Sequence, residues 1–273
     1  MNDSDDVKLT YDGGIALVTL NRPQAKNALT PAMTVALTEM FRSFRSDEQV
    51  RVVVFAGAGA DFCSGGDVKA MGGGAPRTTE QRRQGMAPYR DLVLAVSALD
   101  KPVIAAVDGV AYGAGLSLAL LADIVLCSYR ARMAAVFHRI GLVPDVGAWY
   151  TLPRVVGLQR AKELVFSARE FGSDEAKRMG LAMEVLAPEA LMTRAIEIAR
   201  SFESASGTAM SLSKQALQKS LQCDLETMLD LEATGQAIAA GSDYTRESIR
   251  RFAAKESPQF RWAPLPATEY KND

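Results

Sequence analysis

The sequence predicts an α/β protein that continues into an all-helical C-terminal region. Apolar runs typical of buried strands alternate with segments of helical periodicity through the first two-thirds of the chain. Beyond Pro188 only the helical pattern continues. We therefore expect an α/β core over residues 1–200, followed by a helical region over residues 201–273.

Each predicted element has its own local signal. Residues 7–9 and 15–20 flank Asp12-Gly13-Gly14, a pattern that predicts a β-hairpin. Thr30-Pro31 is a favourable helix start, and apolar residues then recur at helical spacing up to Phe44. Further strands are expected at residues 52–56, 102–107 and 124–127, with a helix ending near residue 99 and others at 114–122, 189–204, 208–221, 224–240 and 242–255.

Composition narrows the class of protein. The chain has 273 residues, 48% of them hydrophobic and 23% charged, which is a usual mixture for a globular protein with a sizeable core. A net charge of −1 favours neither nucleic acid nor an anionic membrane as a partner. Three widely spaced cysteines and an acidic start without a signal-peptide pattern predict a cytoplasmic protein. With a single histidine and no metal-ligand spacing, no metal site is expected.

Two glycine-rich stretches, residues 62–69 (FCSGGDVK) and 108–115 (DGVAYGAG), each lie between a predicted strand and a predicted helix. Glycines let a ligand approach the backbone, and the start of a helix presents N–H groups that have no internal partner. Tight turns alone explain one such stretch. Two of them can converge to direct two N–H donors at one oxygen, which is the geometry of an oxyanion hole.

Asp145 is a lone carboxylate in an apolar segment, IGLVPDVG at residues 140–147. One interpretation is a helix N-cap that follows Pro144. The other is a general base, because apolar surroundings raise the pKa of a carboxyl group and make its ionised form a stronger base. The residues alone leave both interpretations open.

Six segments of the chain, taken together and in order, resemble the crotonase (enoyl-CoA hydratase/isomerase) superfamily. They are Asn21-Arg22-Pro23 with Asn27-Ala28-Leu29, and residues 62–71, 101–123, 141–147, 152–157 and 252–260. The resemblance implies the spiral crotonase fold of repeated ββα units, ending in a helical trimerisation region. It also implies an acyl-CoA substrate with no separate cofactor, and a homotrimer or a dimer of trimers.

The resemblance also assigns residues to roles. It places the oxyanion hole at the backbone N–H groups of Gly66 and Ala114. Coenzyme A would be held by Lys26, Ala28, Ser64, Asp67, Val68 and Lys69, with Phe252 and Lys255 closing over the nucleotide, often from a neighbouring subunit. The acyl pocket is expected to include Met71, Met86, Tyr89, Ser117, Phe137 and Trp149, although methionines and aromatic residues also commonly fill cores.

Two departures from the family pattern bear on the reaction. Hydratases of the superfamily use two glutamates, whose positions are taken here by Ser117 and Phe137. Neither is a carboxylate, so hydration by the two-glutamate route is not expected, and Ser117 is also explained as a small residue in a close-packed helix. Asp145 instead resembles the single acid/base of isomerases in phenylacetate catabolism, which convert ring-1,2-epoxyphenylacetyl-CoA to the oxepin and shift enoyl-CoA double bonds.

The sequence therefore predicts an enzyme, an acyl-CoA isomerase with Asp145 as acid/base. Residues 229–232 and 241–244 strengthen the resemblance to the phenylacetate-pathway isomerases. The alternatives are a hydratase-like enzyme, a haloaryl-CoA dehalogenase-like enzyme in which Asp145 is the nucleophile, and a non-catalytic protein that binds acyl-CoA or RNA. His138, beside Arg139 on a connecting segment, is expected to be a partly exposed structural residue.

Overall fold

Two β-sheets form the centre of the computed structural model, which describes residues 6–67 and 77–264. The larger sheet has the strand order β1 (Val7–Asp12), β2 (Ile15–Leu20), β3 (Val52–Gly57), β4 (Val103–Val107), β6 (Ile124–Ser128) and β9 (Glu184–Leu186). Its first pair is an antiparallel hairpin, and the pairs that follow are parallel. The smaller sheet has the order β5 (Val110–Tyr112), β7 (Arg132–Ala134) and β8 (Glu170–Gly172).

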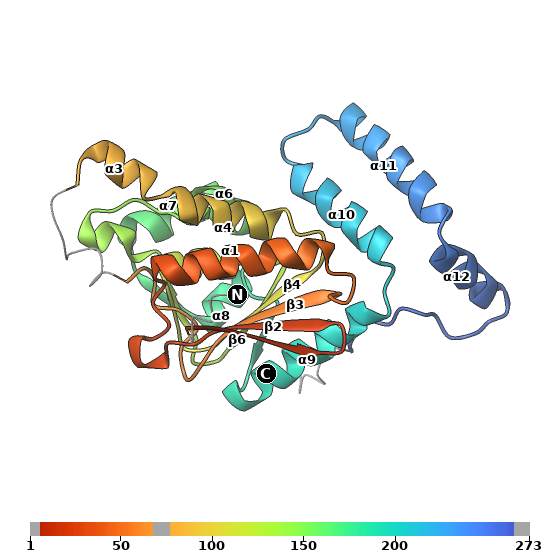
Figure 1. The fold of residues 1–273 in the computed structure, drawn as a ribbon, viewed down its shortest axis with the longest axis horizontal. Helices are drawn as coiled ribbons and strands as arrows, with labels where there is room; N and C mark the ends of the chain where they lie inside the picture. The colour runs from red at the N-terminus through yellow and green to blue at the C-terminus, as the bar shows by residue number, and fades with distance from the viewer. Residues whose placement is uncertain (1–5, 68–76, 265–273) are drawn as a thin grey trace, which may run out of the picture.

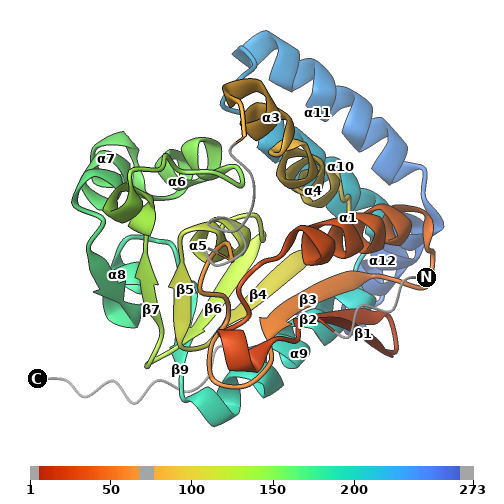
Figure 2. The ribbon, with the colours of Figure 1, turned by 60° about the vertical axis from the view of Figure 1, so that its left-hand side comes forward.

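Helices cover both faces of the larger sheet, and this is why β3 and β4 are continuous apolar runs. Figure 2 shows α1 (Pro31–Ser46) and α4 (Ala87–Ser97) on one side and α9 (Pro188–Glu203) on the other. Helix α1 begins where Thr30 accepts a hydrogen bond from the Met33 N–H at 3.1 Å, with Pro31 at its first position. Its apolar residues then face the sheet at helical spacing, as the sequence predicts.

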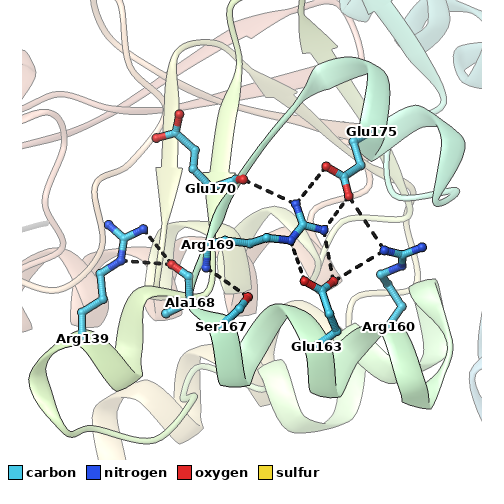
Figure 3. Close-up of polar contacts among 8 residues, drawn as sticks. All are labelled: Arg139, Arg160, Glu163, Ser167, Ala168, Arg169, Glu170 and Glu175. Atoms are coloured by element: carbon cyan, nitrogen blue, oxygen red, sulfur yellow. Dashed lines mark hydrogen bonds and ion pairs between the residues drawn. The ribbon is translucent and has the colours of Figure 1, made fainter.

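Shorter elements lie between these strands and helices along the chain. They are η1 (Pro23–Ala25), α3 (Thr79–Gln84), α5 (Ala114–Ala119), η2 (Val136–Ile140), α6 (Ala148–Val156), α7 (Leu158–Ser167) and α8 (Ser173–Arg178). Figure 3 shows polar contacts that hold α7, β8 and α8 together: Arg169 donates to Glu163 at 2.5 Å and to Glu175 at 2.6 Å. Arg139 donates two hydrogen bonds to the Ala168 carbonyl, which ties η2 to the end of α7.

Three further helices, α10 (Gly207–Lys219), α11 (Leu225–Ala240) and α12 (Asp243–Ala253), extend away from the body as an arm (Figure 1). None of them has a buried residue. Lys214 joins the arm to the body by donating to the Lys101 carbonyl at 2.8 Å and to Asp123 at 2.6 Å. No helix within residues 6–67 and 77–264 combines the length and apolarity that crossing a membrane requires.

The predicted α/β architecture with a helical C-terminal region is confirmed, and the last strand of the described chain ends at Leu186. The four predicted C-terminal helices lie within a few residues of α9 to α12. Two details were wrong: residues 110–112 of the second glycine-rich stretch form β5, and the helix predicted over 114–122 ends at Ala119. The predicted boundary after residue 200 falls inside α9, whereas the arm begins at Gly207.

Candidate active site

The two glycine-rich stretches lie side by side, joined by main-chain hydrogen bonds. Cys63 donates to the Val110 carbonyl at 2.9 Å, and Tyr112 donates back to the Cys63 carbonyl at 3.0 Å. The approach is too close for side chains at two positions. A methyl group on Gly115 would lie 2.1 Å from the Cys63 carbonyl oxygen, and one on Gly65 would lie 2.9 Å from that of Tyr112. The predicted convergence of the two stretches therefore exists.

The Gly66 N–H has its direction fixed by its own peptide group. The Gly65 carbonyl accepts a hydrogen bond from the Leu29 N–H at 2.8 Å, and the Asp67 N–H donates to the Leu29 carbonyl at 3.0 Å. In a trans peptide the C=O and N–H point in opposite directions, so the Gly66 N–H points away from Leu29. Within the described chain it has no acceptor.

The Ala114 N–H is fixed in the same way. The Gly113 carbonyl, at the other end of that peptide group, accepts a hydrogen bond from the Ser117 N–H at 3.0 Å inside α5. The Ala114 N–H therefore points out of the first turn, and it too meets no acceptor among the residues described. The Ala114 nitrogen lies 3.7 Å from where a methyl group on Gly65 would be, so the peptides that carry the two N–H groups are close neighbours.

Asp145 lies in a turn that precedes α6. Helix α6 takes Gly147 as its N-cap residue and has no side-chain cap, so the N-cap interpretation of Asp145 was wrong. The Oδ1 atom of Asp145 is buried and has no hydrogen-bond partner in the described chain. Burial raises the pKa of this carboxyl group to about 6. These are the properties expected of a general base rather than of a structural cap.

Helix α4 packs across the Asp145 turn. A methyl group on Gly147 would lie 3.2 Å from Val93 of α4. Tyr89, one helical turn before Val93, is half-buried, and burial raises the pKa of its hydroxyl. The negative charges of Asp145 and Asp67 raise this pKa further, so the phenol lies within electrostatic range of both carboxylates.

Ser117 and Phe137 both lie beside the peptide that carries the Ala114 N–H. Ser117 is 1% exposed, and its hydroxyl donates to the Gly113 carbonyl at 3.1 Å. Phe137 is 7% exposed, and its ring would lie 3.8 Å from a methyl group on Gly113. At the two positions to which the sequence resemblance assigns the glutamates of a hydratase, this chain therefore has a hydroxyl that is already engaged and an aromatic ring.

The residues expected to hold coenzyme A are partly assembled. The Ser64 N–H donates to the Lys26 carbonyl at 2.9 Å, so these two segments run alongside each other. Arg22 donates to the Ala28 carbonyl at 2.7 Å and to Asp67 at 3.2 Å, joining both sides of this region. Lys26 is exposed, as a side chain that meets an anionic ligand needs to be.

Sequence reasoning missed the structural roles of Arg22 and Asn27. Asn27 is fully buried, has a positive φ of 55°, and donates to the carbonyls of Ala58 and Asp61 at 2.9 and 2.7 Å. It thereby joins the segment after β2 to the loop after β3, which leads to Gly66. Both residues lie in the Asn21–Leu29 segment that carries part of the family resemblance, and a further signal was a polar side chain within a turn between buried elements.

Other predicted site residues lie apart within the single chain. Phe252, 86% exposed, and Lys255 lie at or just after the end of α12, far out on the arm (Figure 1). Met86 and Trp149 are exposed. His138 is exposed and its ring stacks on that of Phe166. The predictions for Val68, Lys69 and Met71 fall outside the described residues.

Fold and site together define a class of protein: an α/β enzyme whose glycine-rich backbone presents two neighbouring N–H donors, and whose Asp145 carboxyl group has a raised pKa. Residues 10–262 match the family model described as enoyl-CoA hydratase/isomerase. The chain therefore belongs to the enoyl-CoA hydratase/isomerase family, within the crotonase superfamily, and acts on acyl-CoA thioesters.

Individual relatives agree with this assignment. The chain is 36% identical over 250 residues to a 1,2-epoxyphenylacetyl-CoA isomerase of Escherichia coli, an alignment that covers 90% of this chain and 95% of the relative. It is 35% identical to a short-chain-enoyl-CoA hydratase of Clostridium acetobutylicum, covering 92% and 95%. A solved enoyl-CoA hydratase/isomerase from Cupriavidus metallidurans superposes with a TM-score of 0.92 at 39% identity, covering 98% of this chain and all of that one. The crotonase fold is thus confirmed.

Proposed function

We propose that this enzyme is an isomerase, which moves a proton within an acyl-CoA thioester through an enolate. The observation that carries the proposal is the carboxyl group of Asp145, which has a pKa of about 6 and a buried oxygen without a hydrogen-bond partner among the residues described. Ser117 and Phe137, which by resemblance take the positions of the two glutamates of a hydratase, supply no acid or base. A proton shift between two carbons on one face of the substrate needs only one base.

The proposed mechanism uses the two main-chain donors and Asp145. The thioester oxygen binds between the N–H groups of Gly66 and Ala114, which hold the charge that develops as the enolate forms. Each such donor contributes roughly 10²- to 10³-fold to the rate in comparable sites. Asp145 is ionised at neutral pH, removes a proton from the acyl chain and returns it at another carbon. Its raised pKa makes it a stronger base than an ordinary aspartate.

For the acyl group we propose an unsaturated or ring-epoxide chain, as in phenylacetate catabolism. The support is the similarity to the E. coli protein named 1,2-epoxyphenylacetyl-CoA isomerase. Aromatic side chains suit such a group: Phe137 lies beside the donor peptide, and Tyr89 lies near Asp145. Met71, Met86, Ser117 and Trp149 complete the set of side chains proposed to surround the acyl chain.

We propose that the nucleotide part of coenzyme A lies against Lys26, Ala28, Ser64, Asp67, Val68 and Lys69. Phe252 and Lys255 would reach it from a neighbouring copy, because in the single chain they lie out on the arm. The proposed assembly is a homotrimer or a dimer of trimers. It is supported by apolar side chains that α10 to α12 leave open to water, among them Leu217, Leu229 and Ile249. The three cysteines are free thiols, which fits the proposed cytoplasmic location.

A substrate panel tests the proposed reaction. Pure enzyme is incubated with linear 3-enoyl-CoA, crotonyl-CoA and an aryl-epoxide CoA thioester, and the products are followed by absorbance and mass. The expected result is a change of absorbance at unchanged mass for the 3-enoyl or epoxide thioester. Efficient addition of one water to crotonyl-CoA would contradict the isomerase proposal and favour a hydratase like the Clostridium relative.

The other two alternatives give distinct results when a haloaryl-CoA is added to the panel. A dehalogenase-like reaction through Asp145 would release halide from a haloaryl-CoA and, in a single turnover in oxygen-18 water, leave the label in the Asp145 carboxyl group. A non-catalytic acyl-CoA-binding protein would bind the thioesters and convert none of them. Either outcome would contradict the proposed isomerase.

A further inference from the structure

Each of the two peptide groups that supply an N–H donor to the candidate oxyanion hole also has a carbonyl oxygen. In both peptide groups this oxygen accepts a hydrogen bond from a buried side chain. The Gly113 carbonyl, which shares a peptide group with the Ala114 N–H, accepts from the Ser117 hydroxyl as well as from the Ser117 N–H. The Gly65 carbonyl, which shares a peptide group with the Gly66 N–H, accepts from the Cys63 thiol at 3.8 Å as well as from the Leu29 N–H. The two halves of the hole are thus built alike.

We propose that Ser117 and Cys63 are positioning residues, which polarise and orient the two amide donors through the carbonyl oxygens of the same peptide groups. A hydrogen bond to a peptide oxygen draws electron density toward that oxygen and makes the N–H of the same peptide a stronger donor. Two hydrogen bonds to each carbonyl oxygen also prevent the peptide group from rotating, and so keep the direction of its N–H group fixed. The inference rests on the proposed function, in which these amides bind a thioester oxygen.

The surroundings allow both side chains to act in this way. Ser117 is 1% exposed and Cys63 is 0% exposed, so neither donor exchanges its partner with water. Burial raises the pKa of Cys63 to about 12, which keeps the thiol protonated and able to donate. If position 117 required only a small residue that packs closely in a helix, alanine would meet that requirement equally well. The hydroxyl is the part that packing alone does not require.

The expected size of the effect follows from two general magnitudes. Cooperative strengthening by about 10–30%, applied to a donor whose loss costs about 10²- to 10³-fold, gives about a two- to eight-fold change in kcat per side chain. The effect should fall on kcat and leave KM nearly unchanged, because the enolate carries more charge on its oxygen than the bound thioester does.

Isotope-edited infrared spectroscopy measures the polarisation directly. The probe is butyryl-CoA labelled with carbon-13 at the thioester carbonyl, bound to wild type and to folded Ser117→Ala, Ser117→Cys, Cys63→Ala and Cys63→Ser variants. If each side chain acts as a donor, the carbonyl frequency should follow donor strength at both positions. Alanine should give the highest frequency, cysteine an intermediate one and serine the lowest, so Cys63→Ser should fall below wild type.

Matched controls separate this role from general loss of packing. Cys127 is likewise buried, with a pKa of about 12, and its thiol donates to the Glu184 carbonyl at 3.8 Å away from the site. Ser201 of α9 is buried and donates to the Ile198 carbonyl at 2.6 Å. Cys127→Ala and Ser201→Ala should change stability without changing the carbonyl frequency or kcat.

The outcomes distinguish this inference from the proposed function. If the thioester carbonyl of butyryl-CoA bound to wild type has the same frequency as in water, there is no oxyanion hole and the proposed function fails. If wild type lowers the frequency but the folded Ser117→Ala and Cys63→Ala variants lower it equally and keep wild-type kcat, the proposed role of these side chains is overturned. The proposed role is also overturned if the carbonyl frequencies of the variants do not follow the order of donor strength.

Discussion

The main-chain carbonyl of Asp145 accepts a hydrogen bond from the Ala148 N–H at 3.0 Å, closing a turn whose two central residues have positive φ. One of them, Val146, has a φ of 48°, which is an unfavourable conformation for a β-branched residue. Its side chain is 4% exposed and belongs to the hydrophobic core, which holds it there. The core thus maintains the strained turn that follows Asp145.

Replacing this carboxyl group by an amide tests its role. Asp145→Asn should abolish isomerisation while leaving acyl-CoA affinity within several-fold of wild type, because shape is kept and only proton transfer is lost. Loss of a positioned acid/base typically costs about 10²- to 10⁴-fold in rate. Single-turnover assays give the rate and calorimetric titration gives the affinity. Turnover near the wild-type level would exclude Asp145 as the base.

The pH dependence of catalysis should report the same group. Because Asp145 acts in its ionised form and has a pKa of about 6, kcat/KM should fall as the pH is lowered through 6. Below that value the rate should drop tenfold per pH unit. A profile that stays flat between pH 5 and 7 would contradict the assignment.

The raised pKa also predicts a dependence of stability on pH. An aspartate in the unfolded chain has a pKa near 3.8, and burial raises that of Asp145 to about 6 in the folded state. Between these values the folded state binds more protons, so this group's contribution to the free energy of unfolding is present below pH 4 and is lost as the pH rises through 6. Asp145→Asn should therefore gain stability relative to wild type as the pH rises, approaching on the order of 3 kcal/mol above pH 7.

Denaturant unfolding of both proteins at pH 4 and pH 7.5, at equal concentration, measures this difference. Phe137→Leu, which leaves the carboxyl group in place, provides a control whose stability difference should not vary with pH. A constant difference between Asp145→Asn and wild type at the two pH values would mean that the carboxyl group is not destabilised by burial.

Proline at position 114 should remove one oxyanion donor while preserving its helix. Ala114 is the first residue of α5, the position at which a helix tolerates proline best. Ala114→Pro should lower kcat by about 10²- to 10³-fold. Leu158→Pro is the matched control, since it removes an N–H at the first position of α7, and it should keep both circular dichroism and activity. A folded Ala114→Pro enzyme with wild-type turnover would show that the charge is stabilised elsewhere.

The exposed arm predicts assembly into several copies. Leu217, Leu221 and Leu225 are each at least 70% exposed, and a hollow of about 430 Å³ lies between α10 and α11. Light scattering at micromolar concentration should therefore give the mass of a trimer or a dimer of trimers. Leu217→Glu with Leu221→Glu should lower that mass, whereas Val35→Glu, on the exposed side of α1, should not. A fully active monomer would contradict the prediction.

Much of the fold could be predicted because long elements have strong local signals. The sixteen-residue α1, for example, combines Thr30, Pro31 and an apolar face. The strands β7, β8 and β9 have three residues each, too few for a periodic pattern. The helices of the arm were also predictable, but their outward course was not, because an amphipathic pattern does not say whether its partner belongs to the same chain.

The candidate site divides in the same way. Two glycine-rich stretches, each between a strand and a helix, indicated that two N–H donors can converge, and the family resemblance assigned these donors to Gly66 and Ala114. The strained turn at Asp145 was not predictable, since no local pattern indicates a positive φ at a valine. The hydroxyl of Ser117 looked like that of any small helical serine until its contact with the Gly113 carbonyl placed it behind the Ala114 N–H.

Both proposed donors belong to the main chain, and this has a consequence for engineering and for evolution. A side-chain substitution at Gly66 or Ala114, proline excepted, cannot delete an N–H group, so the capacity to activate a thioester is inherited by nearly every folded variant. In mutational libraries directed at Phe137, Tyr89 and Asp145, the two main-chain donors are therefore retained. Such libraries sample different reactions of the bound thioester. The scaffold retains the two main-chain donors while side chains such as Phe137, Tyr89 and Asp145 are free to diverge.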